Sequence, residues 1–221
     1  MKRVVLIGGG VNGGDFSPDL EKEIVSLVNK ETVHALYIPF ASEDEKGAYE
    51  RFRKLYEEKL NCKTDVIYSE EMNSTSAEKK IASADLVYLG GGSTLKLSEA
   101  CRQNGLDFLL RQASKRSQMF VGFSAGANYL CDSGLSYEGE KGFIQVEGLG
   151  LVSGSCCTHF NYEDRADAFN KMVSLNEEGI GITDHCAVSF VDGQIAVLKD
   201  RKEAKAYKVL RRGEEIVQDE L

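Results

Sequence analysis

The sequence predicts a three-layer α/β fold with a mostly parallel sheet, helices on both faces, and antiparallel edge strands or hairpins near the C-terminus. Three observations support this prediction. Short apolar runs alternate with helical patterns over the first 130 residues, which is typical of parallel strands joined by right-handed crossovers. Three apolar runs end in glycine-rich loops, at 8–14, 90–94 and 122–128. After about residue 131, turn signals such as Asp192-Gly193 separate short apolar segments.

Each element of the first 130 residues has a local signal. Ser17-Pro18-Asp19 predicts a helix start, because serine caps helices, proline suits the first turn and the helix dipole favours an acid there. Thr75-Ser76-Ala77-Glu78 matches a capping box, and Gly105 suits the position after a helix. The expected strands are 3–8, 33–38, 63–67, 86–89 and 119–122. The expected helices are 17–28, 46–60, 75–84, 95–104 and 108–115.

The remainder of the chain predicts mainly β structure. Residues 132–158 contain six glycines and short apolar pieces, which favours irregular strands and loops. A helix is expected over 165–175, followed by strands over 181–183 and 187–191. Asp192-Gly193 predicts a hairpin turn into 194–198, and Arg212-Gly213 separates two last strands, 204–210 and 215–217. Since no long linker, repeat or low-complexity tract interrupts the chain, we expect residues 1–221 to form a single domain.

Composition excludes several classes of protein. The chain has 221 residues and a net charge of −8, which argues against a nucleic-acid partner. No apolar run reaches the roughly 18 residues of a membrane span, and the N-terminal run is too short for a signal peptide. We therefore expect a cytoplasmic protein with no membrane partner. The six cysteines lack the spacing of a zinc site, so we expect free thiols, no metal and no cofactor.

The clearest signal for chemistry is Gly122-Phe123-Ser124-Ala125-Gly126, a G-x-S-x-G pattern between an expected strand and an expected helix. This is the context of a nucleophile elbow, in which a sharp turn lifts a serine hydroxyl above the sheet. Small residues must flank such a serine, and this segment supplies them. The N–H of Ala125 would then point to the position of an oxyanion. The alternative is a simple packing turn.

Two further glycine loops have competing interpretations. Gly91-Gly92-Ser93 brings a second N–H to the oxyanion or begins a helix with Thr94 as its N-cap, and the two interpretations can hold together. Residues 8–13 satisfy G-x-G-x-x-G after the first strand, a pattern of dinucleotide binding. The second strand ends in Tyr37-Ile38-Pro39-Phe40, without the acid that would hold a ribose. A loop that lines a site is therefore the other interpretation.

A nucleophilic serine needs a base, and the chain has three histidines. His34 begins a strand at the end opposite the expected site, His185 follows a short strand, and His159 lies on a loop. We take His159 as the first candidate and His185 as the second. Asp184 closes a short apolar strand and is the first candidate for the acid that orients the imidazole. The competing acids are Glu138, Glu140, Glu163 and Asp164.

Together these motifs resemble the dipeptidase E and cyanophycinase family of serine peptidases. The resemblance rests on Ile38-Pro39-Phe40-Ala41, Gly90-Gly91-Gly92-Ser93-Thr94, the elbow at 122–128, His159-Phe160 and Gly181-Ile182-Thr183-Asp184, in this order. It spans about residues 1–190. It implies a flavodoxin-like sheet similar to that of class I glutamine amidotransferases, and a triad in the chain order serine, histidine, acid.

The resemblance implies a role for each candidate residue. Ser124 is the nucleophile, His159 the general base and Asp184 the third member of the triad. Gly92 and Ala125 supply the oxyanion N–H groups. Dipeptidase E has a glutamate where this chain has an aspartate, so an acid in the 138–140 loop is the alternative third member.

The resemblance also implies a small peptide substrate, with an N-terminal aspartyl or aspartyl-linked residue. The expected substrate-binding residues are Ser93, Asn128 and Arg165. Arg165 either holds a substrate carboxylate as a bidentate fork or is a solvated residue at the start of a helix. Two other functions stay open: a nucleotide-binding protein that uses the 8–13 loop, and a catalytically silent interaction protein. A homodimer is compatible with the sequence.

Overall fold

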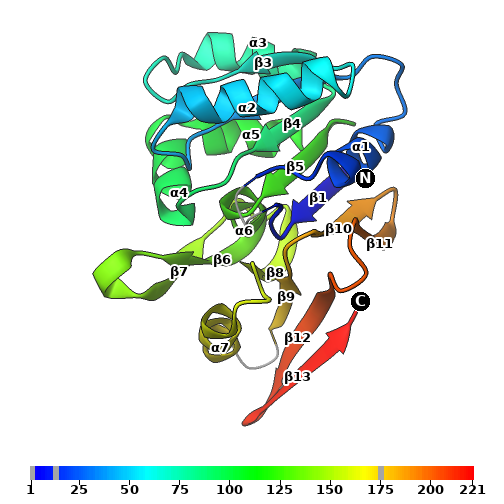
Figure 1. Cartoon of the computed structure of the whole chain (residues 1–221). Coiled ribbons are helices and arrows are strands. Elements are labelled where there is room, and N and C mark those ends of the chain that lie inside the picture. Colours follow the sequence, from blue (N-terminus) through cyan, green and yellow to red (C-terminus); the bar gives the residue numbers. More distant parts are fainter. Residues whose placement is uncertain (1–2, 12–14, 174–176) are drawn as a thin grey trace.

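The computed structural model describes residues 3–11, 15–173 and 177–221, and its framework is two β-sheets (Figure 1). The larger sheet has seven strands in the order β11-β10-β1-β5-β4-β2-β3. The five strands from β1 to β3 in this order pair in parallel, and β10 and β11 add an antiparallel edge beside β1. The strands are β1 (Arg3–Ile7), β2 (His34–Ile38), β3 (Lys63–Val66), β4 (Leu86–Leu89), β5 (Met119–Phe123), β10 (Cys186–Val191) and β11 (Gln194–Lys199).

Helices cover both faces of this sheet, because successive side chains of each buried strand point to opposite faces. Val5 and Ile7 share an apolar cluster with α1 and α2, whereas Val4 and Leu6 share another with α3, α4 and α5. The predicted three-layer α/β fold with a mostly parallel sheet is thus confirmed. The helices are α1 (Pro18–Ser26), α2 (Glu45–Glu58), α3 (Ser74–Ser83), α4 (Thr94–Gln103), α5 (Leu106–Ala113) and α6 (Ala125–Leu130).

Three helix starts differ from the sequence prediction. The side chain of Asn73 caps α3, upstream of the predicted capping box. Ser93, rather than Thr94, caps α4. Ser17 does precede α1, but its hydroxyl donates to Asp200 instead of capping the helix. In the last case a tertiary contact, which the local sequence does not reveal, replaces the capping hydrogen bond.

A second sheet of six strands lies beside the first, in the order β13-β12-β9-β8-β6-β7, and the sequence did not predict it. Residues 132–158, expected to be irregular, form three of its strands. β8 pairs in parallel with both β6 and β9, so no hairpin signal marks these pairings. The strands are β6 (Cys131–Tyr137), β7 (Phe143–Glu147), β8 (Val152–Thr158), β9 (Glu178–Ile182), β12 (Ala206–Arg212) and β13 (Glu215–Glu220), with α7 (Glu163–Met172) and the short 3₁₀ helix η1 (Gly139–Lys141).

Both predicted C-terminal hairpins are present, but they belong to different sheets. β10 and β11 pair antiparallel around Asp192-Gly193 at the edge of the larger sheet, as expected. β12 and β13 pair around Arg212-Gly213 in the second sheet. The two sheets share one apolar cluster, in which Leu6 of β1 lies with Cys156 of β8 and Ala206 of β12. This shared core supports the proposal that residues 1–221 form a single domain.

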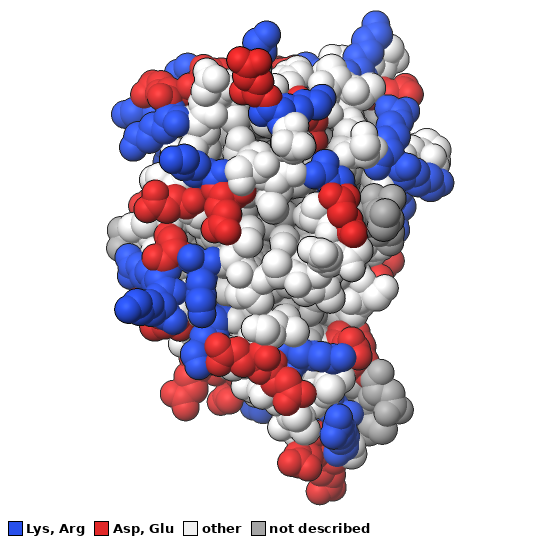
Figure 2. Space-filling view, turned by 90° about the vertical axis from the view of Figure 1, so that its right-hand side faces the viewer, with Lys and Arg blue, Asp and Glu red and all other residues white. Residues whose placement is uncertain are grey.

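On the face seen in Figure 2, charged side chains of both signs surround a broad uncharged area, and no continuous basic surface is present among the described residues of that view. An apolar groove of about 530 Å³ is lined by Val4, Phe190, Ile195 and Leu221, among others. Val4 lies near the start of β1, so the groove is at the strand ends opposite the glycine-rich loops. Among the described helices, none has the length and apolarity to cross a bilayer.

Candidate active site

The loops after β1, β4 and β5 meet at one edge of the larger sheet, because these strands are neighbours and run in the same direction. Ser124 lies in the third of them, between β5 and α6, with φ 52° and ψ −110°. This conformation is costly for a residue with a side chain, by about 1–3 kcal/mol, and is characteristic of a nucleophile elbow. The N–H of Ser124 donates to the carbonyl of Ile7 at 2.9 Å, which fixes the turn to the end of β1.

Two glycines make the sharp turn sterically possible. A Cβ atom on Gly122 would lie 2.5 Å from the backbone nitrogen of Ala127. A Cβ atom on Gly126 would lie 2.7 Å from the carbonyl carbon of Leu89 in β4. Only glycine allows the first turn of α6 to pack this closely on the sheet, as the sequence pattern predicts.

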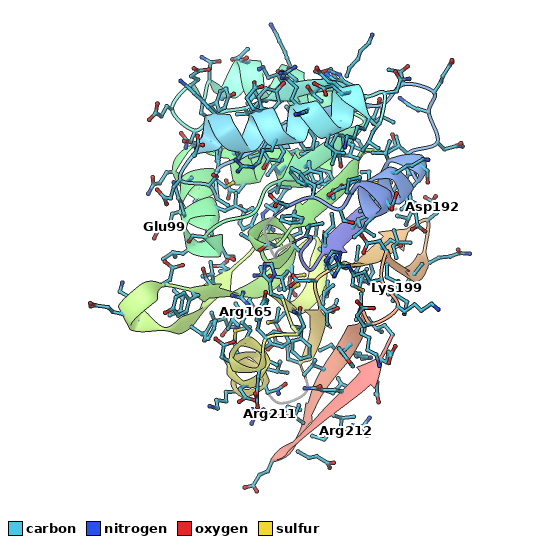
Figure 3. The ribbon with its side chains drawn as sticks, in the orientation of Figure 1. Glu99, Arg165, Asp192, Lys199, Arg211 and Arg212 are labelled. Atoms are coloured by element: carbon cyan, nitrogen blue, oxygen red, sulfur yellow. The ribbon has the colours of Figure 1, made fainter. Side chains whose placement is uncertain are left out.

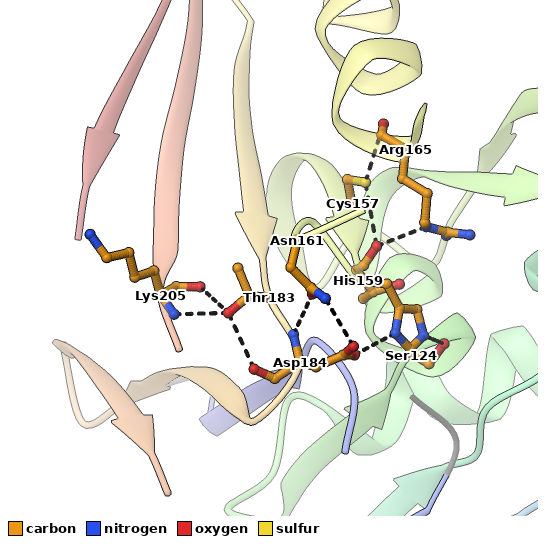
Figure 4. A network of polar contacts seen from close by, with 9 residues as sticks. Ser124, Cys157, His159, Asn161, Arg165, Thr183, Asp184 and Lys205 are labelled. Carbon is orange, nitrogen blue, oxygen red and sulfur yellow. Dashed lines mark hydrogen bonds and ion pairs between the residues drawn. The ribbon is translucent and has the colours of Figure 1, made fainter. Parts of the chain in front are cut away.

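The histidine and the acid complete a chain of hydrogen bonds that begins at the serine (Figure 4). His159 Nε2 lies 2.8 Å from Ser124 Oγ, and His159 Nδ1 lies 2.6 Å from Asp184 Oδ1. A carboxylate only accepts, so Nδ1 carries the proton and Nε2 is free to accept from the serine hydroxyl. The structure therefore brings together the three residues that the sequence predicts as a triad.

Asn161, which sequence reasoning did not identify, fixes the orientation of Asp184. Its Nδ2 donates to Asp184 Oδ2 at 3.2 Å, and its Oδ1 accepts from the backbone N–H of Asp184 at 2.8 Å. Burial raises the pKa of Asp184, but the hydrogen bonds from His159 and Asn161 outweigh burial and leave the pKa below its ordinary value. The carboxylate thus stays ionised beside the imidazole. The one hint in the sequence is that the amide of Asn161 comes two residues after the predicted base, His159.

The glycine loop after β1 packs against His159 and Asp184. The carbonyl of Gly8 accepts from the N–H of His159 at 3.1 Å, and that of Gly9 accepts from the N–H of His185 at 2.9 Å. A Cβ atom on Gly9 would overlap the carboxylate of Asp184 and lie 2.6 Å from His159 Nδ1. The space where a dinucleotide would approach this glycine is therefore filled by the histidine and the aspartate. Asn12 and Gly13 of the G-x-G-x-x-G pattern lie outside the described residues.

Of the two predicted oxyanion residues, Gly92 lines a cavity together with Ser124, and Ala125 directly follows Ser124 in the chain. Ala125 is the first residue of α6, so its N–H has no acceptor within the helix. Gly92 has φ 139°, and a Cβ atom there would overlap the carbonyl of Ala41, so the position requires glycine. A Cβ atom on Gly91 would lie only 3.4 Å from Ser124 Cβ, which shows how closely this loop approaches the serine.

A cavity of about 330 Å³ opens at the serine. Its lining residues are Phe16, Tyr37, Ser42, Ala48, Arg51, Gly91, Gly92, Phe123, Ser124 and His159. Arg51, a residue that the sequence did not single out, is the cation among them. It lies in the middle of α2, about 70 residues from the serine, and no local motif connects the two.

Two of the three predicted substrate-binding residues have structural contacts instead. The Ser93 hydroxyl accepts from an N–H of α4 and donates to Glu138 at 3.0 Å. Asn128 is 1% exposed, and its Nδ2 donates to Thr94 and, at 2.8 Å, to the carbonyl of Leu135. Neither residue lines the cavity at Ser124.

Arg165 is in the first turn of α7, and its side chain extends toward the β6–β7 hairpin (Figure 3). Its Nε donates to the carbonyl of Thr158 at 3.0 Å, and its guanidinium lies 5.5 Å from the centre of the Phe143 ring. It lines a separate cavity of about 400 Å³ with Tyr137, Phe143, His159, Tyr162 and Asp164.

The two alternative histidines and the alternative acid Glu138 have other partners. His185 Nδ1 lies 3.0 Å from Asp200 Oδ1, and His34 Nδ1 lies 3.1 Å from the carbonyl of Ser83. The carboxylate of Glu138 accepts from the hydroxyls of Ser93 and Ser136. Among the residues that the structure describes, none of these groups contacts the Ser124 hydroxyl or the imidazole of His159, and no cluster of three potential metal ligands occurs.

Comparison with known proteins gives a consistent result. Residues 4–198 match the sequence model of peptidase family S51. The chain is 28% identical over 225 residues to an uncharacterized peptidase, YgaJ, of Bacillus subtilis, covering 99% of this chain and 96% of that protein. It is 41% identical to peptidase E of Escherichia coli over 51 residues, which are 23% of this chain and 22% of that protein.

Two crystal structures share the fold. One is a peptidase from an acI-B1 actinobacterium, with a TM-score of 0.74 and 18% identity, covering 100% of this chain and 96% of the other. The second is a putative peptidase E protein from Listeria monocytogenes, with a TM-score of 0.72 and 18% identity, covering 91% of this chain and 100% of the other. At this level of identity the likeness establishes the fold.

Proposed function

The chain belongs to peptidase family S51 and is a serine peptidase of the peptidase E type. From that premise we propose its catalytic residues and its substrate class. It hydrolyses small peptides through Ser124, His159 and Asp184, and it favours an N-terminal aspartyl or aspartyl-linked residue. The observation that carries this proposal is the continuous hydrogen-bond chain from Ser124 Oγ through the imidazole to Asp184, which begins at a strained serine.

The reaction is acyl transfer to water. Ser124 Oγ attacks the peptide carbonyl while His159 Nε2 takes the hydroxyl proton, and the imidazolium is stabilised by Asp184. His159 then gives the proton to the leaving amine, which breaks the peptide bond and leaves an acyl ester on the serine. A water molecule, deprotonated by the same imidazole, hydrolyses the ester and restores the hydroxyl.

The oxyanion that forms in each half of the reaction accepts from the N–H groups of Gly92 and Ala125. These donors are fixed by the glycine-dependent turn against Ala41 and by the start of α6, so they need no reorganisation during the reaction. Loss of one such donor typically raises the barrier by about 3 kcal/mol.

The dimensions of the site favour a short substrate. A cavity of about 330 Å³ is at the small end of the roughly 300–1,000 Å³ that ligand sites span. Aromatic side chains and a guanidinium lie in its wall, which suits a small residue with a negative charge. The aspartyl preference follows the family resemblance and is compatible with this lining.

The test is a panel of dipeptides that varies the first residue, run with wild type, Ser124→Ala and the control Ser117→Ala, whose serine is exposed. We expect Asp-X dipeptides to be cleaved best, Ser124→Ala to lose at least about 10⁴-fold in kcat/KM, and the control to match wild type. A fluorophosphonate should label wild type at Ser124. Full activity of Ser124→Ala would refute the mechanism, and an unlabelled, inactive wild type would indicate a catalytically silent protein.

A further inference from the structure

The cavity at Ser124 has a positively charged side that comes from α2. Ala48 and Phe52 on this helix are buried, and Arg51, between them in sequence, is exposed and lines the cavity. α2 follows β2, whose C-terminal end lies at the same edge of the sheet as the elbow. The fold therefore places a guanidinium in the cavity that contains the nucleophile.

Arg51 has no anionic partner among the described residues, although the chain carries 35 acidic side chains. Arg53, two positions along the same helix, shows the contrast. Its guanidinium pairs with Glu50 at 2.8 Å and with Glu57 at 3.3 Å. Arg51 thus presents free donors to the cavity, whereas those of Arg53 are occupied on the helix surface.

A hydroxyl lies in the same cavity. Tyr37 lines it, and no hydrogen bond is formed by the Tyr37 hydroxyl within the described ranges. Burial raises the pKa of Tyr37 and the positive charge of Arg51 lowers it, with burial dominant, so the phenol stays protonated and the guanidinium lies close enough to affect it. Phe16 and Phe123 form apolar walls beside these two donors, with ring centres 5.5 Å apart.

The direction of the reaction decides which part of a substrate meets Arg51. The leaving amine must receive its proton from His159, so the leaving residue lies on the imidazole side of the serine. The cavity that contains Arg165 includes His159 but not Ser124 and suits that residue. His159 lines both cavities, but of these two only the cavity that contains Arg51 also includes Ser124 and the predicted oxyanion donor Gly92, so it suits the acyl residue.

We propose that Arg51, with the Tyr37 hydroxyl, binds the side-chain carboxylate of the acyl residue and is the residue that determines specificity for an acidic side chain. A guanidinium holds a carboxylate through two parallel hydrogen bonds, and the aromatic walls exclude water from one side. This assigns to Arg51 the role that the sequence suggested for Arg165. The inference rests on the proposed peptidase function.

The test compares two dipeptides of the same shape, Asp-Leu and Asn-Leu, which differ only in the charge of the first side chain. Arg51→Gln should lower kcat/KM for Asp-Leu by about 30- to 100-fold, as expected for loss of hydrogen bonds to a charged group. It should leave kcat/KM for Asn-Leu within about threefold of wild type, because the lost contacts are made only to the carboxylate. Arg51→Lys keeps the charge without the fork and should fall between the two.

Arg53→Gln is the matched control and should leave both substrates unchanged. Equal loss on both dipeptides in Arg51→Gln, or no loss on either, would overturn the assignment, as would loss of the preference in Arg165→Gln instead. Thermal unfolding of each variant shows whether it is folded. Ser124→Ala tests the peptidase mechanism separately from the role of Arg51. If this variant retains activity, the peptidase mechanism is wrong. If wild type cleaves both dipeptides equally through Ser124, the triad mechanism stands, whereas the aspartyl preference and the role of Arg51 are both wrong.

Discussion

Gly9 lies directly beneath Asp184, so closely that a Cβ atom on the glycine would overlap the Oδ1 atom of the aspartate. The same Cβ atom would lie 2.6 Å from Nδ1 of His159. The exit of the first strand therefore forms the surface on which the base and its acid meet. This explains a glycine-rich loop after β1 in a peptidase without any need for a nucleotide.

Gly9→Ala should separate the base from its acid. The added methyl group must displace Asp184 or the imidazole, and misorientation of either by about 1 Å typically costs about 100-fold in rate. We expect kcat to fall by at least that factor, with the far-ultraviolet circular dichroism spectrum unchanged. Gly139→Ala is the control, because its φ of 56° gives alanine backbone strain while its Cβ atom meets nothing within 4 Å. Wild-type kcat in Gly9→Ala would show that the loop is not in contact with the triad in solution.

The sequence predicted the parts of the site that depend on local chemistry. Small residues around Ser124 are needed for the turn itself, and they are adjacent to it in sequence. Asp184 lies in the turn that follows β9, two residues after the strand ends at Ile182. In both cases the local backbone determines where the side chain points, so the sequence motif was enough to predict the place of the residue in the site.

The sequence did not predict the parts that depend on distant contacts. Arg51 reaches the cavity only because β2 and β5 end at the same edge of the sheet, with β4 between them. Asn161 acts through a partner 23 residues away. The second sheet was missed because β8 finds both neighbours through parallel pairing, which leaves no turn signal. Asn128 was misjudged since a buried structural amide and a substrate-binding amide look alike in sequence.

Asp184→Asn tests the third member of the triad. An amide at this position can donate to the imidazole and favour the wrong tautomer, which in a serine peptidase lowers kcat by about 10⁴-fold. The matched control is Glu138→Gln, which replaces the acid of the alternative 138–140 loop. Glu138 contacts Ser93 and Ser136 rather than the triad, so we expect kcat of Glu138→Gln to fall by less than about tenfold. The reverse order of the two effects would move the role to Glu138.

The strain at Ser124 predicts an unusual effect on stability. Glycine adopts φ 52° and ψ −110° with little strain, whereas alanine bears the same steric cost as serine. Ser124→Gly should therefore have a free energy of unfolding about 1 kcal/mol higher than Ser124→Ala, although both lack activity. Urea unfolding of the two variants at one pH measures this difference. Equal stability would mean that the elbow relaxes when the hydroxyl is removed.

The buried carboxyl group of Glu21 should make the free energy of unfolding depend on pH. Its side chain is 1% exposed in α1 and accepts from the hydroxyls of Tyr56 and Tyr88, each at 2.7 Å. Burial raises its pKa from 4.5 to about 7, against the smaller opposing effect of the two hydrogen bonds. Between these values the unfolded chain loses the proton while the folded chain retains it. The contribution of Glu21 to stability is therefore full below about pH 4.5 and falls as the pH rises to about 7.

Glu21→Gln removes this titration, since the amide stays neutral and can still accept from one tyrosine hydroxyl. Relative to Glu21→Gln, wild type should lose about 3 kcal/mol of unfolding free energy between pH 4.5 and pH 8. Urea unfolding of both proteins across this range measures the change. The control is Glu23→Gln on the same helix, where the side chain is exposed and the substitution should leave the free energy of unfolding close to that of wild type. A constant difference between wild type and Glu21→Gln would show that Glu21 titrates alike in the folded and unfolded chain.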